Sequence, residues 1–190
     1  MKPQIDDYLV LAKINQTVER EFEYFKEFIF NKTLIWEGVP NPKTGGNLHK
    51  VVGDSGGYTL WGIAYNHNKE TFKNFDDFVN TTYEEAAAIA YIKYYRAISA
   101  FILPYAARLM YFDMAYNMGN ARAIKIMQKC AGVPQDGIIG PITRDKMQYV
   151  TEECLYTARK SFYNSLVKTN RTLVKFLKGW LNRTEAIKNY

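Results

Sequence analysis

The sequence predicts a mainly α-helical protein with one small insert of strands and loops. From Val18 to Trp36, apolar residues recur at three- and four-residue steps between charged ones, as they do along one face of a helix or of two successive helices. Glycine and proline then concentrate between Gly38 and Ala64, which excludes a long helix there. Helical patterns resume after residue 68. A loop-rich insert at about 38–68 in a helical frame is where function is expected.

Local signals place the ends of the elements in the first half. The first helical pattern ends near Glu37 and Gly38, and the aromatic run from Tyr58 to Tyr65 predicts a short strand or a hairpin edge. Thr82-Tyr83-Glu84-Glu85 has the form of a capping box, which predicts a helix over 86–95.

Similar signals divide the second half into helices. Pro104 suits the first turn of a helix that ends at Gly119. Asn120 is expected to cap the next helix, which Gly132 terminates. After a turn-rich link at 133–141, we expect one long helix from about 142 to 167 and a final helix from about 172 to 188.

The length bounds the domain organisation. The 190 residues suffice for one domain with a sizeable core, or for two small lobes. We predict an N-terminal extension at 1–20, a lobe carrying the insert at 21–103 and a helical lobe at 104–190, together forming one compact unit. The extension either packs on the helical frame or docks a partner.

Composition excludes several classes of protein. The chain is 47% hydrophobic and 23% charged, as folded proteins are, so wholesale disorder is excluded. Its formal net charge of +6 is spread along the chain, whereas nucleic-acid binders show clustered cations. A polyanionic partner such as a cell wall fits the charge, and so does a solvated basic surface with no partner. We expect no nucleic-acid partner and a monomer.

Neither a metal nor a cofactor is expected. The two histidines, His49 and His67, do not lie at ligand spacing from the two cysteines, Cys130 and Cys154. Two cysteines cannot build a disulfide framework for a chain of this size, and free, buried thiols are the expectation. Both histidines are interpreted as loop surface.

The N-terminal residues show neither a signal-peptide pattern nor a membrane span. Met1 to Asp7 lack a basic and then apolar stretch, and no run approaches about 18 uninterrupted apolar residues. We therefore expect synthesis as a soluble cytoplasmic product without stable membrane insertion, so that any work outside the cytoplasm requires release by another factor.

Three polar residues in and beside the insert suggest chemistry. Glu37 follows Leu34-Ile35-Trp36, and apolar surroundings raise the pKa of a carboxyl toward that of a general acid. Asp54 lies in a glycine-rich turn where it stays ionised, and Thr59 is placed to hydrogen-bond a water. A protonated and an ionised carboxyl facing one another across a cleft suit glycoside hydrolysis. A purely structural or solvated role fits these residue types as well.

Other residues have two interpretations each. Tyr58, Trp61 and Tyr65 suit stacking on sugar rings or packing in a core. Asp113 and Asn117, one turn apart in an apolar helix, suit a cleft floor, although a buried Asp113 satisfied by its neighbours is the favoured interpretation. The Asp136-Gly137 and Gly140-Pro141 turn suits either a helix connection or a wall-binding module.

Four stretches resemble glycoside hydrolase family 108, lysozyme-like muramidases with a C-terminal peptidoglycan-binding segment. Ile35-Trp36-Glu37-Gly38 resembles the family's catalytic Glu-Gly-Gly-Tyr motif, and the run from Asp54 to Ile63 resembles its Asp-Pro-Gly-Gly-x-Thr-x-x-Gly-Ile motif. The segments from Phe112 to Thr143 and from Phe176 to Arg183 are similar to its later motifs.

The resemblance implies a lysozyme-type α+β fold and cleavage of the bond between N-acetylmuramic acid and N-acetylglucosamine. It implies Glu37 as the catalytic acid, with Asp54 and Thr59 as further catalytic candidates, and peptidoglycan strands as partner. Tyr58, Trp61, Tyr65 and Asn117 are the candidate substrate-binding residues. The expected setting is that of a phage endolysin released by a holin, or of a virion- or secretion-associated lysin.

Two departures from the family pattern motivate alternatives. Val39 and Pro40 replace the second Gly and the Tyr of the catalytic motif, and the segment between Glu37 and Asp54 is long. A non-catalytic peptidoglycan-binding protein is one alternative. A lytic transglycosylase, which needs the acid and no water-positioning carboxylate, is the other.

Overall fold

A continuous helical segment forms the frame of the N-terminal half in the computed structural model, which describes residues 3–38, 45–50 and 56–190. The segment joins α2 (Gln16–Phe25), a π-helical turn (Lys26–Phe30) and α3 (Asn31–Trp36). Phe22, Phe25, Ile29 and Leu34 are fully buried, which confirms the amphipathic pattern that predicted the helix. The helix ends as predicted, since Glu37 is its C-cap and Gly38 has a φ of +79°.

The chain divides between Lys93 and Tyr94 into two compact units. In the N-terminal unit the helical frame is accompanied by short elements, and its mainly α character agrees with the predicted fold class. These elements are α1 (Ile5–Ala12), β1 (His49–Lys50), β2 (Tyr58–Leu60), β3 (Ile63–Ala64), α4 (Tyr65–Asn68), a 3₁₀ turn (Lys69–Thr71), α5 (Phe75–Val79), α6 (Tyr83–Ala90) and the first part of a π-helical segment (Tyr91–Arg96).

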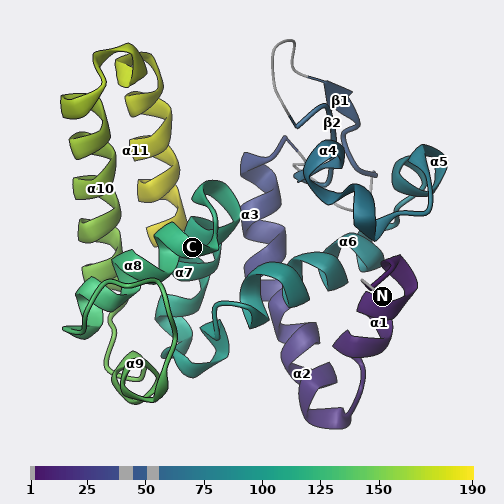
Figure 1. Ribbon diagram of the computed structural model, residues 1–190, viewed down its shortest axis with the longest axis horizontal. Coiled ribbons are helices and arrows are strands. Elements are labelled where there is room, and N and C mark those ends of the chain that lie inside the picture. The colour runs from purple at the N-terminus through teal and green to yellow at the C-terminus, as the bar shows by residue number, and fades with distance from the viewer. Residues whose placement is uncertain (1–2, 39–44, 51–55) are drawn as a thin grey trace. The chain divides into compact units, whose positions relative to one another are not determined.

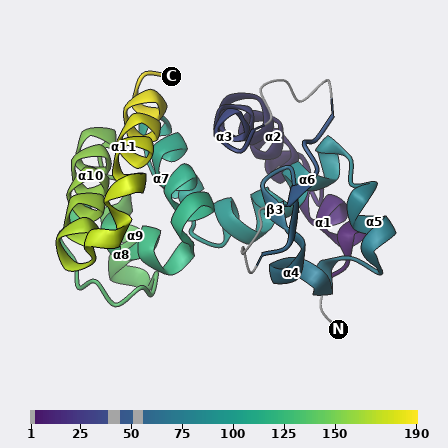
Figure 2. The ribbon, with the colours of Figure 1, turned by 90° about the horizontal axis from the view of Figure 1, so that it is seen from above.

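Helix α1 packs on α6 (Figures 1 and 2). Ile5, Tyr8 and Ala12 of α1 are buried, so the N-terminal extension belongs to the core of its unit. Helix α6 opens with the predicted capping box, in which Thr82 Oγ1 accepts from the Glu85 amide and Glu85 Oε2 accepts from the Thr82 amide.

The C-terminal unit is all helical over its described length. It contains a 3₁₀ turn (Ala100–Ile102), α7 (Tyr105–Met118), α8 (Asn120–Ala131), α9 (Pro141–Met147), α10 (Glu152–Thr169), a 3₁₀ turn (Arg171–Leu173) and α11 (Val174–Lys188). Helices α10 and α11 lie side by side and both contact α7 (Figure 2).

Most helix ends in this unit were predicted, and two were not. Helix α7 follows Pro104, and α8 stops at Gly132, which has a φ of +69°. Asn120 is the first residue of α8 and not its cap. The single helix expected over 142–167 is two helices, because the Thr151 side chain accepts from the Cys154 amide and starts α10 anew.

A buried carboxylate ties three helices of this unit together. Asp113 of α7 is completely buried and accepts from Arg159 Nη2 of α10 at 2.7 Å. It also accepts from Arg183 of α11 through Nη2 at 2.7 Å and Nε at 3.0 Å. Burial alone would raise the pKa of Asp113, but the two guanidinium groups hold it below its ordinary value. The favoured interpretation of Asp113 is thus confirmed, and a role on a cleft floor is wrong.

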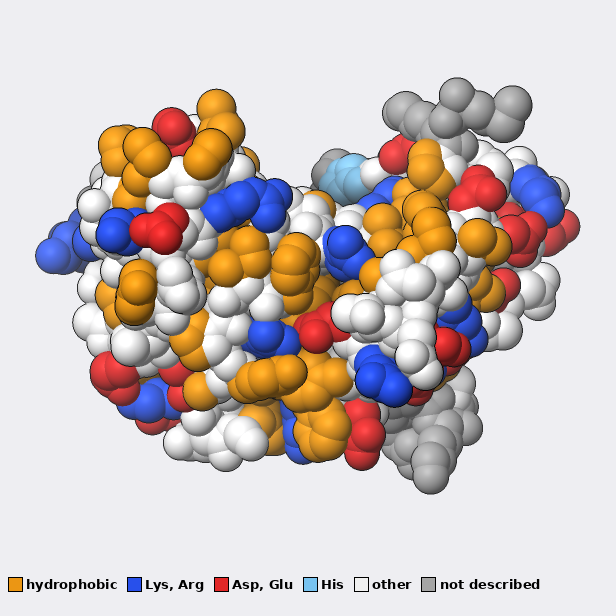
Figure 3. Space-filling model, turned by 90° about the horizontal axis from the view of Figure 1, so that it is seen from below, with side chains coloured by type: hydrophobic (Ala, Val, Ile, Leu, Met, Phe, Trp, Pro, Cys, Tyr) orange, Lys and Arg blue, Asp and Glu red, His pale blue; other side chains and the backbone are white. Residues whose placement is uncertain are grey.

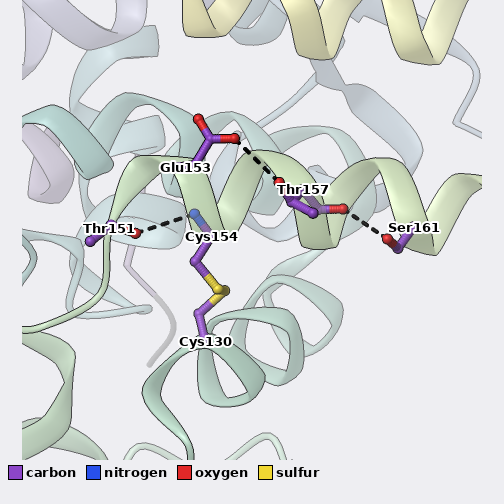
Figure 4. Close-up of a disulfide and its surroundings, with 6 residues drawn as sticks. All are labelled: Cys130, Thr151, Glu153, Cys154, Thr157 and Ser161. Atoms are coloured by element: carbon purple, nitrogen blue, oxygen red, sulfur yellow. Dashed lines mark hydrogen bonds between the residues drawn. A yellow bond between two sulfur atoms is a disulfide. The ribbon is translucent and has the colours of Figure 1, made fainter.

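The two cysteines form a disulfide, which corrects the expectation of free thiols. Cys130 near the end of α8 is bonded to Cys154 in the first turn of α10 (Figure 4). Their sequence separation is 24 residues, a loop length for which a disulfide stabilises a fold by about 3 kcal/mol. Free and bonded cysteines look alike in a sequence, because the helix packing that joins them is tertiary.

The Asp113 network predicts the effect of a one-atom change. Asp113→Asn leaves two buried guanidinium groups facing a neutral amide and should destabilise the protein by about 3–5 kcal/mol. The same change at Asp145, a largely exposed residue of α9, should cost less than about 0.5 kcal/mol. Urea unfolding of both variants measures the difference, and equal costs would contradict the role given to Asp113.

The depressed pKa of Asp113 makes the free energy of unfolding depend on pH, and the sign of this dependence follows from the direction of the shift. Because its folded pKa is depressed, its stabilisation is complete above the unfolded pKa of about 3.9 and is lost as the pH falls through the folded pKa. The parent protein should therefore lose more stability than Asp113→Asn across this acid range.

Candidate active site

The candidate acid Glu37 lies at the C-terminal end of α3, where the chain enters the insert. Its backbone amide donates to the Leu34 carbonyl at 2.9 Å, and its side chain is half-buried. The next residue, Gly38, has a left-handed conformation, and a Cβ added there would lie 3.2 Å from Asn47 Nδ2. The end of α3 therefore lies against the segment that leads into β1.

The insert contains a three-stranded antiparallel sheet in the order β1-β2-β3. Thr59 of the central strand pairs with His49 of β1 and with Ala64 of β3. Directly opposed residues of an antiparallel pair project from the same face, so the half-buried His49 lies beside Thr59. The interpretation of His49 as loop surface is corrected by its place in β1. Neither His49 nor Asn47 was a candidate, because no sequence signal fixes which residue of this loop opposes Thr59.

Tyr58 and Thr59 project from opposite faces of the sheet, since successive strand residues alternate. Tyr58 is 40% exposed, its ring lies 5.2 Å from that of Phe75, and Lys50 lies over it at 5.4 Å. The Tyr58 and Thr59 side chains therefore do not share one face of the sheet.

Tyr65 is half-buried in an aromatic cluster of the N-terminal unit. Its ring lies 5.2 Å from Phe75 and 5.0 Å from Phe78. Tyr58, Phe75 and Tyr65 thus form a connected set of rings with partial exposure. Hydrophobic side chains gather over the N-terminal unit, with lysines and arginines between them, on the right of Figure 3.

Trp61 is buried, and its predicted role in stacking on sugar is corrected. Only 4% of it is exposed, its Nε1 donates to the Thr81 carbonyl at 2.8 Å, and its ring meets Tyr83 edge-on. Trp61 and Gly62, with φ of +55° and +78°, are the two turn residues between β2 and β3. Two positive φ angles in a row are typical of a type I′ hairpin turn. A residue other than glycine adopts this conformation only at a cost in conformational energy. The indole acts as an anchor of the hairpin.

Asn117 and Asp54 complete the candidate set. Asn117 lies on α7 of the C-terminal unit, where its side chain is fixed by a 2.8 Å hydrogen bond from the Tyr163 hydroxyl. Asp54 lies outside the described residues, as do Val39 and Pro40. Over residues 3–38, 45–50 and 56–190, no group of three or more His, Cys, Asp or Glu could hold a metal ion.

Comparison with known proteins assigns a family. Residues 30–119 match the model of Glycosyl hydrolase 108, and residues 122–185 match that of a Predicted Peptidoglycan domain. The chain carries a glycosyl hydrolase 108 domain, and the peptidoglycan segment follows it. The chain is a glycoside hydrolase of peptidoglycan, and the peptidoglycan segment extends from within α8 to within α11.

The structure of Brucella abortus SagA shares the fold. It is 24% identical, with a TM-score of 0.63, over 82% of this chain and 92% of that one. The likeness agrees with a mainly α fold of the predicted class. A search of curated proteins found no match. No helix in the described part of the chain is long and apolar enough to cross a membrane.

The different settings of Trp61 and Tyr58 predict different defects. Trp61→Phe removes the donor to the buried Thr81 carbonyl and should lower the free energy of unfolding by about 1–3 kcal/mol, with KM for peptidoglycan fragments unchanged. Tyr58→Ala loses the ring contact with Phe75 and should lower the free energy of unfolding by about 1 kcal/mol, and loss of about 1 kcal/mol of contact with the sugar should raise KM roughly fivefold. Urea unfolding and steady-state kinetics separate the two. A raised KM in Trp61→Phe with unchanged stability would contradict the assignment.

Proposed function

We propose that this enzyme is an N-acetylmuramidase, which cleaves peptidoglycan between N-acetylmuramic acid and N-acetylglucosamine with Glu37 as general acid. The observation that carries the proposal is the placement of Glu37. It is half-buried at the end of a rigid helix whose last turn contains Leu34 and Trp36, with Gly38 turning the chain against the insert. General acids of glycosidases are carboxyl groups that flank the scissile bond, and a position at the entrance to the insert supports this role for Glu37.

In the proposed reaction, Glu37 donates its proton to the glycosidic oxygen as the bond to the anomeric carbon breaks. The bonding electron pair leaves with that oxygen, and positive charge develops on the sugar ring. Water then adds to the anomeric carbon and loses a proton, which restores the Glu37 carboxyl for the next cycle. We assign Asp54 to stabilising the charge or orienting the water, and Thr59, with His49 beside it, to hydrogen-bonding that water.

Removal of the acid tests the proposal. Glu37→Gln keeps the shape of the side chain and should reduce hydrolysis of purified sacculi by about 10²–10⁴-fold or more, with an unchanged melting temperature. Glu27→Gln, the same change on the π-helical turn of the same helical segment, is the matched control and should remain active.

Product analysis of the parent enzyme decides which bond is cut. Mass spectrometry should find reducing N-acetylmuramic acid ends. Reducing N-acetylglucosamine ends would overturn the bond assignment, and anhydromuramic ends would establish a lytic transglycosylase. Binding to sacculi without release of sugar ends would leave a non-catalytic wall-binding protein.

We further propose that the enzyme acts in bacterial lysis, as a phage endolysin does, reaching the wall from the cytoplasm when another factor opens the membrane. The Cys130–Cys154 disulfide supports work outside a reducing cytoplasm, and the net charge of +6 suits an anionic envelope.

Controlled expression tests this setting. Bacteria that accumulate the protein in the cytoplasm should grow normally and lyse within minutes of membrane permeabilisation. Cells that accumulate Glu37→Gln should survive the same treatment with intact walls. Lysis by the parent protein without permeabilisation would contradict the proposed release step.

A further inference from the structure

A groove of about 470 Å³ runs between α8 and α10 in the C-terminal unit. One wall carries Arg122, Lys125 and Lys129 of α8, and the other carries Ser161, Phe162 and Ser165 of α10. A second hollow of about 480 Å³ continues from it, sharing Lys129, Ala158 and Ser161 and adding Thr151, Thr157 and the disulfide residue Cys154. Figure 4 shows Thr151, Thr157 and Ser161 along α10, with the disulfide reaching across to α8. The two hollows adjoin at these shared residues, and we call them together the α8–α10 groove.

The three cations of the α8 wall are not neutralised by ion pairs in the described part of the chain. They are exposed, and their spacing of three and four residues places them on one face of the helix. Across the described part of the chain, no ion pair engages any of them. The described lining of the first hollow includes no carboxylate.

The nearest acidic groups already have partners of their own. Asp136, which feels the charge of Lys125, accepts from Gln128 Nε2 at 2.6 Å and from the Ile138 amide at 2.8 Å. Glu153, in the second hollow, is paired with Lys188 and accepts from Thr157. The groove therefore presents a net positive wall to a ligand.

The spacing of the cations defines the ligand. Seven helical residues separate Arg122 from Lys129, a rise of about 10 Å. An extended peptide covers that distance in about three residues. Hydroxyl groups line the opposite wall and suit the amides of such a peptide. The chemistry is that of a short, extended peptide with several carboxylates, and the stem peptide of peptidoglycan is one.

We propose that the α8–α10 groove binds the carboxylates of the peptidoglycan stem peptide. The proposal rests on peptidoglycan being the substrate and does not depend on which glycosidic bond is cut. It assigns the recognition of the peptide to the C-terminal unit.

The disulfide supports ligand binding because it fixes the distance between the two walls of the groove. Cys130 directly follows Lys129 on the α8 wall, and its partner Cys154 lines the α10 wall. The covalent bond holds the walls at one separation before a ligand arrives, so little ordering is needed on binding.

Binding to sacculi tests the proposal in the inactive Glu37→Gln background, where hydrolysis plays no part. Arg122→Gln, Lys125→Gln and Lys129→Gln combined should weaken binding roughly tenfold, since each exposed charge contact contributes up to about a factor of five. The matched control is Lys168→Gln, Arg171→Gln and Lys178→Gln, which removes one arginine and two lysines from exposed positions outside the groove. It should bind within twofold of the parent.

If both triple variants lose sacculus binding equally, the groove is not the binding site and the loss is an effect of overall charge. Thermal unfolding checks that both remain folded. If the parent enzyme does not cut the muramidase bond, its reaction products show this. The comparison of sacculus binding between the two triple variants does not depend on that result.

A competition experiment identifies the chemical group. A synthetic stem tetrapeptide with free carboxylates should displace the Glu37→Gln protein from sacculi, and the same peptide with every carboxylate converted to an amide should not. The groove triple variant should lose this sensitivity to the acidic peptide. Equal displacement by the amidated peptide, or stronger displacement by inorganic phosphate at the same ionic strength, would overturn carboxylate recognition.

Discussion

The C-terminal unit depends on one buried negative charge. Asp113 has no contact with solvent, and the groups that neutralise it come from two other helices, Arg159 on α10 and Arg183 on α11. Removing one member of such a network leaves an uncompensated charge in a medium of low polarity. The network continues through Tyr163, which lies next to Arg159 and donates to Asn117. Helices α7, α10 and α11 are therefore held in one arrangement by electrostatics as well as by packing.

This network also crosses the division between the two matched families. Asp113 lies in the glycosyl hydrolase match at 30–119, whereas Arg159 and Arg183 lie in the peptidoglycan match at 122–185. The peptidoglycan segment thus completes its core with a residue of the preceding segment. Within the C-terminal unit, the two matched segments share one hydrophobic and ionic interior and do not form separate modules.

The sequence was sufficient where the cause of a structure is local. The capping box at Thr82, the start of α7 after Pro104 and the end of α8 at Gly132 all depend on a few neighbouring residues, and all were predicted. The break between α9 and α10 was missed, although Thr151 followed by Glu152 and Glu153 carries a helix-start signal.

In the candidate site, the features that the sequence does not predict are those that depend on distant residues. Glu37 was placed correctly at a helix end because the preceding pattern is helical. For Trp61 the sequence allows both sugar stacking and core packing, because its burial depends on the distant Thr81 and Tyr83. His49 was set aside because its position beside Thr59 is a matter of strand register. Register and burial are tertiary properties, which the spacing of residues in one sequence does not fix.

The disulfide has a consequence for how the chain acquires its structure. A protein with four cysteines can pair them in three ways, whereas Cys130 and Cys154, the two cysteines of this chain, admit one intramolecular pairing. Oxidation of a single chain therefore has no wrong isomer in which to be trapped and needs no reshuffling. In a monomeric sample, the count of free thiols therefore reports directly the fraction of chains that carry the Cys130–Cys154 bond.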